Sequence, residues 1–543
     1  MATVIVNGTE IEIGEDERLN GIQVARRAGV DVPHYCWHPG LSVVASCRMC
    51  LVETGRRDPA TGEISMMPKV VPGCQTPATD NTVFVTDSDK VKAARAMVEE
   101  DLLIRHPIDC PICDKAGECA LQDYHFKHGR EERRADLKPF TSRRRPMGDT
   151  VTLFVDRCVM CTRCVRFTRE ITGTAELMVI NRGSHEEIDV FPGYPLDNKM
   201  SGNVVDLCPV GALGDKDFLY SQRVWFMKSH DGVCAGCSTG CSIKIEENQD
   251  RIYRLKPREN RHVNQWWMCD EGRYGFKYVH NAERQIQPTV STADGATPVE
   301  WPEAQSHLQN LLKNSPKLAV VVSPFLTVEE AFMLCKLAKQ ADPDAILALG
   351  PVPQSGQDES FANGFTIRAE KCPNRRGVEK VIGHFAGQTT SFEDFVTDTD
   401  CSSLDAVWVT GGYPQDWMTT DQATKLSAAG QLIVQDIFTS PVWEVASVRL
   451  PGVAFAEREG SYVNANDRLQ SFEWAIRPPA GAMMEGRLYW NLLGEMGMYD
   501  AQRIRQMVAR EIAFFAPAAG EIPAEGVDLR INQIAQTQSE VTA

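Results

Sequence analysis

The chain has 543 residues, and its 73 acidic and 57 basic side chains give a formal net charge of −16 at pH 7. This length allows roughly three to five domains, and the negative charge argues against nucleic acid as a partner. The charge fits simple solubility or an acidic docking face. No apolar run approaches the ~20 residues of a membrane-spanning helix, so we expect partners to hold the protein at any membrane where it works.

Fifteen of the eighteen cysteines lie between Cys36 and Cys269, in groups too regular for disulfides. The chain opens Met-Ala-Thr-Val-Ile-Val, without the basic start and apolar core of a signal peptide, so we expect a reducing compartment. With one histidine, these cysteines form four candidate iron–sulfur ligand sets. The first set is Cys36, Cys47, Cys50 and Cys74; the second is His106, Cys110, Cys113 and Cys119; the third is Cys158, Cys161, Cys164 and Cys208; the fourth is Cys234, Cys237, Cys241 and Cys269.

The spacing favours iron over zinc. Several thiolates must converge on a cluster, and two-residue spacing lets one loop wrap it, whereas zinc usually takes two such ligands from each of two places. The run Cys158-Val-Met-Cys161-Thr-Arg-Cys164 therefore predicts a cubane cluster. Zinc competes better at the fourth set, whose spacing is looser and whose last ligand is remote. The other alternative, a set of buried apolar thiols, is weak here.

The first predicted domain covers residues 1–84. Residues Thr3 to Ile13 alternate around Asn7-Gly8, which predicts a hairpin, and Leu19 to Ala25 have helical spacing. This order resembles a plant-type [2Fe-2S] ferredoxin of β-grasp fold. Ten residues separate Cys36 from Cys47 where that type has four. The longer loop resembles the ferredoxin-like domain of respiratory complex I and of related hydrogenases.

A second domain is predicted over 85–125. Apolar positions from Ser88 to Arg105 keep helical phase, with Asp87 or Ser88 as the cap, and this helix delivers His106. The three cysteines that follow lack a fourth partner, so we interpret His106 as a ligand. A neutral imidazole in place of a thiolate should raise the cluster potential, although hydrogen bonds and burial can reverse this effect.

A third domain, 126–225, should hold one cluster. Its basic stretch between Lys127 and Arg145 is interpreted as a solvated linker, with charge compensation of clusters or docking of an acidic partner as alternatives. A two-cluster ferredoxin has a further cysteine where this chain has Thr168, so we expect the distant Cys208, followed by Pro209, to supply the fourth ligand.

The rest of the chain divides into three predicted segments. Residues 226–282 resemble the small [4Fe-4S] domain that begins molybdopterin oxidoreductases. Residues 283–515 alternate strands and helices, which predicts a doubly wound α/β domain similar to the pterin-binding region of those enzymes. The tail, 516–543, is rich in Ala, Glu, Pro and Gln and is predicted to be disordered or ordered by a partner. The expected strands are Leu318–Ser323, Ala345–Leu349, Ala406–Thr410 and Gln431–Gln435, with helices at Val328–Ala341 and Thr419–Ala429.

Four sets in this order resemble the large iron–sulfur subunit of bacterial complex I, the NADH:quinone oxidoreductase, over the chain to about Arg477. The resemblance implies one [2Fe-2S] and three [4Fe-4S] clusters, the fourth set apart from the main electron path. It implies electron transfer from a flavin- and NADH-binding partner toward quinone-side iron–sulfur subunits, coupled to ion translocation. It also implies a peripheral place on the cytoplasmic side of the inner membrane.

Two features oppose a working molybdopterin site. Glu271 stands where formate dehydrogenase-like enzymes have a lysine between cluster and pterin, and we expect no further cofactor-covering domain after the α/β region. Cys372, the one candidate metal ligand, is predicted to be a thiol in a polar surface loop that runs from Lys371 to Arg376. Cys335 is predicted to lie in the core, and Cys401 is uninformative.

No bond chemistry of its own is expected of this chain. It has no Gly-x-Gly-x-x-Gly after a strand, no P-loop and no nucleophile and base pair. An electron-transfer subunit of a soluble NAD-linked hydrogenase or formate dehydrogenase is the alternative function. A non-redox scaffold with structural zinc is the alternative from another class.

Overall fold

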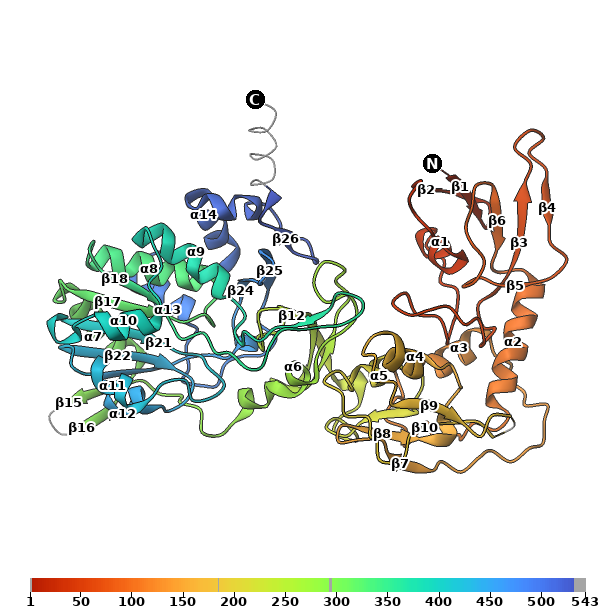
Figure 1. Ribbon diagram of the computed structural model, residues 1–543, viewed down its shortest axis with the longest axis horizontal. Coiled ribbons are helices and arrows are strands. Elements are labelled where there is room, and N and C mark those ends of the chain that lie inside the picture. The colour runs from red at the N-terminus through yellow and green to blue at the C-terminus, as the bar shows by residue number, and fades with distance from the viewer. Residues whose placement is uncertain (1, 184, 293–294, 532–543) are drawn as a thin grey trace. The chain divides into compact units, whose positions relative to one another are not determined.

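The computed structural model describes residues 2–183, 185–292 and 295–531, which form two compact units (Figure 1). Unit 1 comprises residues 1–227 with 361–363, and unit 2 comprises 228–360 with the chain from 364 on. Both units combine helices and sheets, so the prediction of a multidomain α/β chain is confirmed. The finer domain boundaries stay predictions, and most of the predicted tail lies outside the described residues.

Unit 1 begins with the predicted hairpin, whose turn residues Asn7 and Gly8 both have positive φ. The predicted helix begins after Asn20, whose side chain accepts from the backbone NH groups of Ile22 and Gln23. The sheet has the order β2-β1-β6-β3-β4, with β1 and β6 parallel, as a β-grasp domain requires. The elements are β1 (Ala2–Val6), β2 (Thr9–Ile13), α1 (Gly21–Arg27), β3 (Leu51–Arg57), β4 (Ile64–Met66), β5 (Val71–Pro72) and β6 (Thr82–Val85).

The remainder of unit 1 consists of short elements around the cysteine loops. Ser88 caps the predicted helix by accepting from the NH of Val91, which decides between the two candidate caps. The basic stretch ends in a strand rather than in a linker, since Arg144 and Arg145 pair with β8. The elements are α2 (Asp89–Leu103), α3 (Ala120–His128), β7 (Arg144–Pro146), β8 (Val151–Phe154), α4 (Arg163–Glu170), β9 (Leu177–Ile180), β10 (Glu187–Val190), α5 (Asn203–Leu207) and β11 (Leu213–Asp215).

Unit 2 opens with a three-stranded antiparallel sheet that carries the loops of the fourth set. Cys234 and Cys241 lie at one end of that sheet, and Cys269 immediately precedes a short helix. The elements are β12 (Lys228–Val233), β13 (Ser242–Asn248), β14 (Arg251–Pro257) and α6 (Asp270–Tyr274).

The main sheet of unit 2 confirms the doubly wound prediction. Its order is β16-β15-β23-β22-β21-β17-β18, and the five strands from β23 to β18 are parallel. In chain order these five strands run 2-1-3-4-5, so the winding direction reverses between β17 and β21. The strands are β15 (Thr289–Thr292), β16 (Gly295–Pro298), β17 (Leu318–Val322), β18 (Ile346–Leu349), β21 (Ala406–Thr410), β22 (Gln431–Asp436) and β23 (Val448–Pro451).

Helices cover both faces of this sheet. Leu318, Val320 and Val322 of β17 belong to one hydrophobic core, whereas Ala319 and Val321 belong to the other. The first core packs against α7 (Trp301–Lys313), α8 (Val328–Ala341), α9 (Arg375–Ala386), α13 (Glu485–Leu492) and α14 (Ala501–Glu511). The second packs against α10 (Phe392–Asp398), α11 (Thr420–Leu426) and α12 (Pro441–Val445). Two smaller sheets contain β19 (Glu359–Ser360), β20 (Thr366–Ile367), β24 (Gly460–Val463), β25 (Arg468–Phe472) and β26 (Val527–Asp528).

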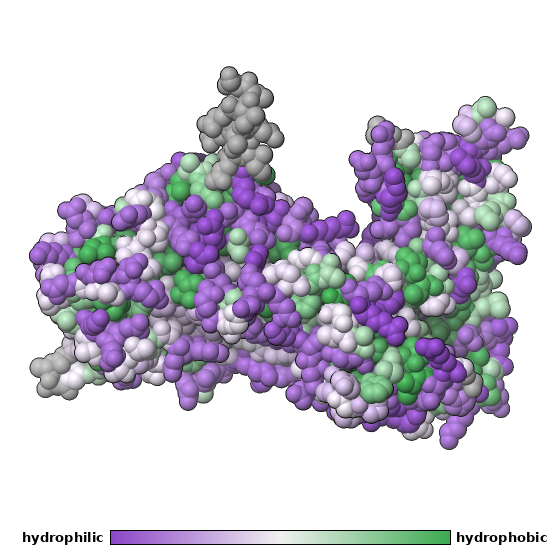
Figure 2. All heavy atoms as spheres, in the orientation of Figure 1, coloured by the Kyte–Doolittle hydropathy of each residue, from purple (hydrophilic) through white to green (hydrophobic). Residues whose placement is uncertain are grey.

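The molecule's visible face is mostly hydrophilic, with apolar patches on both units (Figure 2). Among the helices of the described residues, none combines the length and apolar character needed to cross a membrane.

A buried ion network joins three segments of unit 2. Arg458, 2% exposed, donates to Glu330 of α8 at 2.7 Å and to Glu485 of α13 at 2.9 Å. Both carboxylates are buried, so each depends on this guanidinium for compensation of its charge.

We predict that Arg458→Met destabilises unit 2 by about 3–5 kcal/mol, because two buried carboxylates lose their cation. Urea unfolding followed by tryptophan fluorescence measures this loss. Arg530→Met, which breaks the more exposed pair with Asp528, is the matched control and should cost less than about 1 kcal/mol. Equal effects of the two substitutions would contradict the role given to Arg458.

Candidate iron–sulfur ligand sets

The four cysteines of the first set converge. Hydrogen bonds from Cys47 and Cys74 lower the pKa of Cys36, and the same bonds raise the pKa values of their donors. Cys50 shares a side-chain hydrogen bond with Cys74. The backbone NH of Cys36 also donates to the sulfur of Cys47 at 3.5 Å. A group of sulfurs that share protons in this way can bind a cationic metal cluster in place of those protons.

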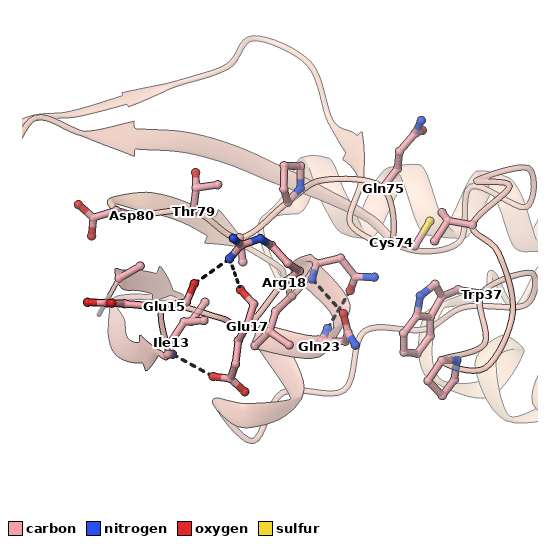
Figure 3. Close-up of a pocket in the computed structure, with 18 of the residues that line it drawn as sticks. Ile13, Glu15, Glu17, Arg18, Gln23, Trp37, Cys74, Gln75, Thr79 and Asp80 are labelled. Atoms are coloured by element: carbon pink, nitrogen blue, oxygen red, sulfur yellow. Dashed lines mark hydrogen bonds between the residues drawn. The ribbon is translucent and has the colours of Figure 1, made fainter. Parts of the chain in front are cut away.

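One side of the first set borders a cavity of about 750 Å³ (Figure 3). Trp37 and Cys74 lie at one end of this cavity, and Glu15 and Asp80 lie at the other. Arg18 donates to the backbone oxygens of Glu15 and Glu17 along the wall. Cys74 lines this cavity although it is 1% exposed, and the more exposed ligand of the set is Cys47.

The second set is assembled by a helix end and by residues from the third domain. Helix α2 ends at Leu103, three residues before His106, as the sequence predicts. Burial and the charge of Arg157 lower the pKa of His106 to about 4, so the imidazole is neutral at pH 7 and can act as a ligand. Burial raises the pKa of Cys113, and the charge of Arg157 opposes this rise. Arg157 also pairs with Asp109 at 3.0 Å. Gly211 lies so close that a Cβ there would meet the Cys113 sulfur at 2.2 Å.

The third set forms an enclosed site. Its four cysteines line one cavity together with apolar side chains. The loop from Cys158 to Cys164 turns tightly at Met160 and Thr162, whose φ values of 47° and 56° are left-handed. Burial raises the pKa of the Cys161 thiol to about 11, with the neighbouring Cys208 as the next cause. Burial thus favours the neutral thiol of Cys161, and a bound cationic cluster would offset that cost.

Thr168 occupies the position of the missing fifth cysteine. It is fully buried in α4 (Arg163–Glu170), and its hydroxyl donates to the backbone oxygen of Val165 at 3.1 Å. The structure thus places an ordinary helix residue at this position, and the single cluster of this domain stays a prediction.

Two arginines of α4 connect the first and third sets. Arg166, 6% exposed, donates to the backbone oxygen of Cys36 at 2.5 Å and to that of Cys161 at 3.2 Å. Arg163 donates to the backbone oxygen of Trp37 at 2.5 Å. The NH of Ala120, next to Cys119, donates to the oxygen of Pro209 at 2.9 Å, which connects the second set with the third.

The fourth set is held by the α/β domain of the same unit. Burial raises the pKa of Cys234 to about 12, and the NH of Gly236 donates to its sulfur at 3.5 Å. The backbone of every residue between Cys237 and Cys241 has a hydrogen-bond partner in a distant segment. The contacts are Ser238 N to Glu370 O at 3.0 Å, Ala465 N to Ser238 O at 2.8 Å, Asn464 Nδ2 to Thr239 O at 3.1 Å and Gln470 Nε2 to Gly240 O at 2.7 Å.

The segment around Cys372 differs from its prediction. Cys372 and Asn374 are fully buried, and Cys372 packs with Phe325 and Tyr413, so the prediction of a polar surface loop is wrong. The reason is that this segment fills the space between the main sheet and the loop of the fourth set. Cys335 lies in the core of α8, as predicted, and Cys401 is buried on the other face of the sheet.

A cation also lies beside Glu271. Lys371 Nζ contacts Glu271 Oε2 at 2.6 Å, although the two residues are one hundred positions apart. Sequence reasoning missed Lys371 and Arg166, because neither lies within a recognisable motif. Their sole sequence signal is a positive charge next to a cysteine segment, which is too common to single out a residue.

Among the described residues, no three His, Cys, Asp or Glu side chains are placed to hold one metal ion. An iron–sulfur cluster distributes its protein ligands over several iron atoms, so its ligand sulfurs need not meet at one point. The ligand assignments of all four sets stay predictions.

Five family models match consecutive parts of the chain. They are described as 2Fe-2S iron-sulfur cluster binding domain (residues 1–89), NADH-ubiquinone oxidoreductase-G iron-sulfur binding region (95–134), NADH-quinone oxidoreductase subunit 3, ferredoxin-like domain (148–214), Molybdopterin oxidoreductase Fe4S4 domain (227–281) and Molybdopterin oxidoreductase (389–493). The chain therefore contains [2Fe-2S]- and [4Fe-4S]-binding domains, as predicted.

Whole-protein relatives match the chain in part. The G subunit of NADH-quinone oxidoreductase from Rickettsia typhi is 36% identical over 339 residues, which is 62% of this chain and 48% of the relative. The corresponding G subunit from Streptomyces coelicolor is 34% identical, over 63% of this chain and 40% of the relative. The NADH-ubiquinone oxidoreductase 75 kDa subunit of Reclinomonas americana is 32% identical, over 66% and 51%. The chain spans about half the length of the curated relatives it matches.

One solved structure, of an NAD+-reducing [NiFe]-hydrogenase in the H2-reduced state, has 25% identity to this chain. It covers 41% of this chain and 91% of its own, with a TM-score of 0.34, so it carries no structural argument.

We predict that Arg166→Gln lowers the reduction potentials of both the first and the third cluster, because reduction adds negative charge that the arginine stabilises. The expected shift is roughly 30–60 mV, measured by EPR-monitored redox titration. Arg169→Gln removes the same charge from an exposed position of the same helix and should leave both potentials near their original values. Equal shifts in the two variants would show that the buried contacts are not the cause.

Proposed function

The chain is a relative of the G subunits of NADH-quinone oxidoreductase over about 62% of its length, and on this premise we propose that it is an electron-transfer protein of such a complex. Its ligand sets would hold one [2Fe-2S] and three [4Fe-4S] clusters. Bound clusters supply one-electron transfer. The chain's own residues hold the ligand loops, exclude water from them and compensate their charge.

The contacts of α4 are the observation that carries this proposal. Arg166 reaches the backbone of a first-set ligand and of a third-set ligand at once, so the two loops cannot move independently. Contacts of Ala120 with Pro209 and of Gly211 with Cys113 fix the second set against the third in the same way. Electron transfer between two centres requires that their separation stay constant, and these contacts support that.

We propose that the electrons come from a flavin- and NADH-binding partner and leave toward quinone-side iron–sulfur subunits, with ion translocation in membrane partners. The protein would then be peripheral, on the cytoplasmic side of a bacterial inner membrane. Exposed apolar side chains near the second set offer a surface for one such contact. They are Ile108, Ile112, Trp225 and Phe226.

The hydrogenase or formate dehydrogenase alternative is less favoured. The relatives from Rickettsia typhi, Streptomyces coelicolor and Reclinomonas americana are named as subunits of NADH-quinone or NADH-ubiquinone oxidoreductase.

We further propose that the α/β domain holds no molybdopterin. A cavity of about 850 Å³ lies at the carboxyl ends of β17, β18 and β21, where ligands bind in such folds. Its size would suit a ligand, but its charge does not fit an anionic pterin. Glu271, Glu393 and Asp416 line it, and among its described lining residues Lys371 is the one cation, already paired with Glu271.

Elemental analysis of the purified complex tests the cofactor content. We expect iron and acid-labile sulfide in equal amounts, little zinc, and neither molybdenum nor tungsten near one atom per chain. Stoichiometric zinc with little sulfide would refute the electron-transfer function. Molybdenum with an extractable pterin would instead favour the formate dehydrogenase alternative.

Paired ligand substitutions test the path. Cys161→Ala should remove one [4Fe-4S] EPR signal and reduce NADH:quinone activity by at least about tenfold, because the third set lies on the proposed main path. Cys237→Ala removes a ligand of the fourth set and should lower stability more than rate. Undiminished activity in a stable Cys161→Ala complex would contradict the assignment.

A further inference from the structure

The fourth set has two carboxylates directly after its last ligand, and each faces its own cation. Asp270 lies 4.0 Å from Arg273 of the same helix. Glu271 lies 2.6 Å from Lys371, which comes from a segment of the α/β domain. The Lys371 side chain is 15% exposed, and that of Glu271 is 57% exposed. The second pair therefore connects the ligand region with the α/β domain through charge.

Lys371 lies close enough to the ligands to affect them electrostatically. It lines the same cavity as Cys234, Gly236 and Gly272. Glu271 lines this cavity as well. A positive and a negative side chain therefore border the same cavity as a ligand of the set, and their charges act on that region with opposite signs.

The ammonium group is not needed to hold its own segment in place. The NH of Lys371 donates to the oxygen of Pro353 at 2.8 Å, and the preceding residue, Glu370, is fixed by Ser238 and by Arg375. The backbone position of residue 371 therefore has independent support. What the side chain adds is a positive charge at the wall of the fourth set.

We propose that Lys371 is a positioning residue that, together with Glu271, sets the reduction potential of the fourth cluster; this rests on the proposed [4Fe-4S] occupancy of that set. Reduction adds one negative charge to the cluster, which a nearby cation stabilises and a nearby carboxylate destabilises. The pair carries no net charge, so Lys371 offsets the lowering of the potential that Glu271 would cause.

The test is a charge cycle on the complete complex, read by EPR-monitored redox titration. Lys371→Met should lower the potential of the fourth cluster, and Glu271→Gln should raise it, each by about a tenfold change in the reduction equilibrium, or 59 mV for one electron. The double variant restores neutrality and should return the potential close to its original value. Lys371→Arg, which keeps the charge, should also remain close to it.

Two control variants distinguish a wrong ligand assignment from a wrong inference about Lys371. Cys237→Ala identifies which signal belongs to the fourth set, and if no [4Fe-4S] signal depends on Cys237 the ligand assignment itself is refuted. Arg477→Met breaks an exposed ion pair elsewhere in unit 2 and should not move the potential. With the signal present, unchanged potentials or shifts of the same sign in Lys371→Met and Glu271→Gln overturn the inference alone. If Lys371→Met does not assemble, Glu271→Gln and the double variant still decide.

Discussion

The main physical constraint on this molecule is that many thiolates must lie inside protein, where isolated negative charge is costly. Burial raises the pKa of most of these thiols, so they ionise only when cations stand near them. The proposed clusters would supply part of that positive charge, and in unit 1 buried arginines supply more of it. Arg157, Arg163 and Arg166 are anchored through backbone oxygens or an aspartate, so their positions are as fixed as those of the ligands.

Periodicity and spacing predicted the parts of the structure that depend on local sequence. The hairpin at Asn7-Gly8, a helix cap at Asp87 or Ser88, which proves to be Ser88, and the core strands are confirmed, because turn and cap chemistry act over a few positions. The environment of the ligand sets was not predictable in this way. Arg166 meets Cys36 from 130 positions away, and Cys372 is buried by segments that a polar neighbourhood in the sequence does not reveal.

The α/β domain has the architecture of a ligand-binding fold, and acidic side chains outnumber basic ones among the described residues that line its cavity. Its winding reverses between β17 and β21, and Phe325 and Tyr413 follow these two strands into the cavity. Tyr413 stacks on Trp417 at 4.5 Å, and Trp417 donates to the buried Asp436 at 2.8 Å. These contacts hold the part of the cavity wall that Tyr413 and Trp417 form.

The hydrogen bonds that hold the loop of the fourth set affect the order in which the chain folds during synthesis. The backbone oxygens of Ser238, Thr239 and Gly240 receive their hydrogen bonds from residues 464–470, up to 230 positions later in the chain. During translation the cysteine loop therefore emerges from the ribosome long before its partners exist, and domains form in the order of synthesis. The hydrogen bonds that hold this loop can therefore form only after residues 464–470 have been synthesised, so fixing the loop of the fourth set is a late step in the folding of unit 2.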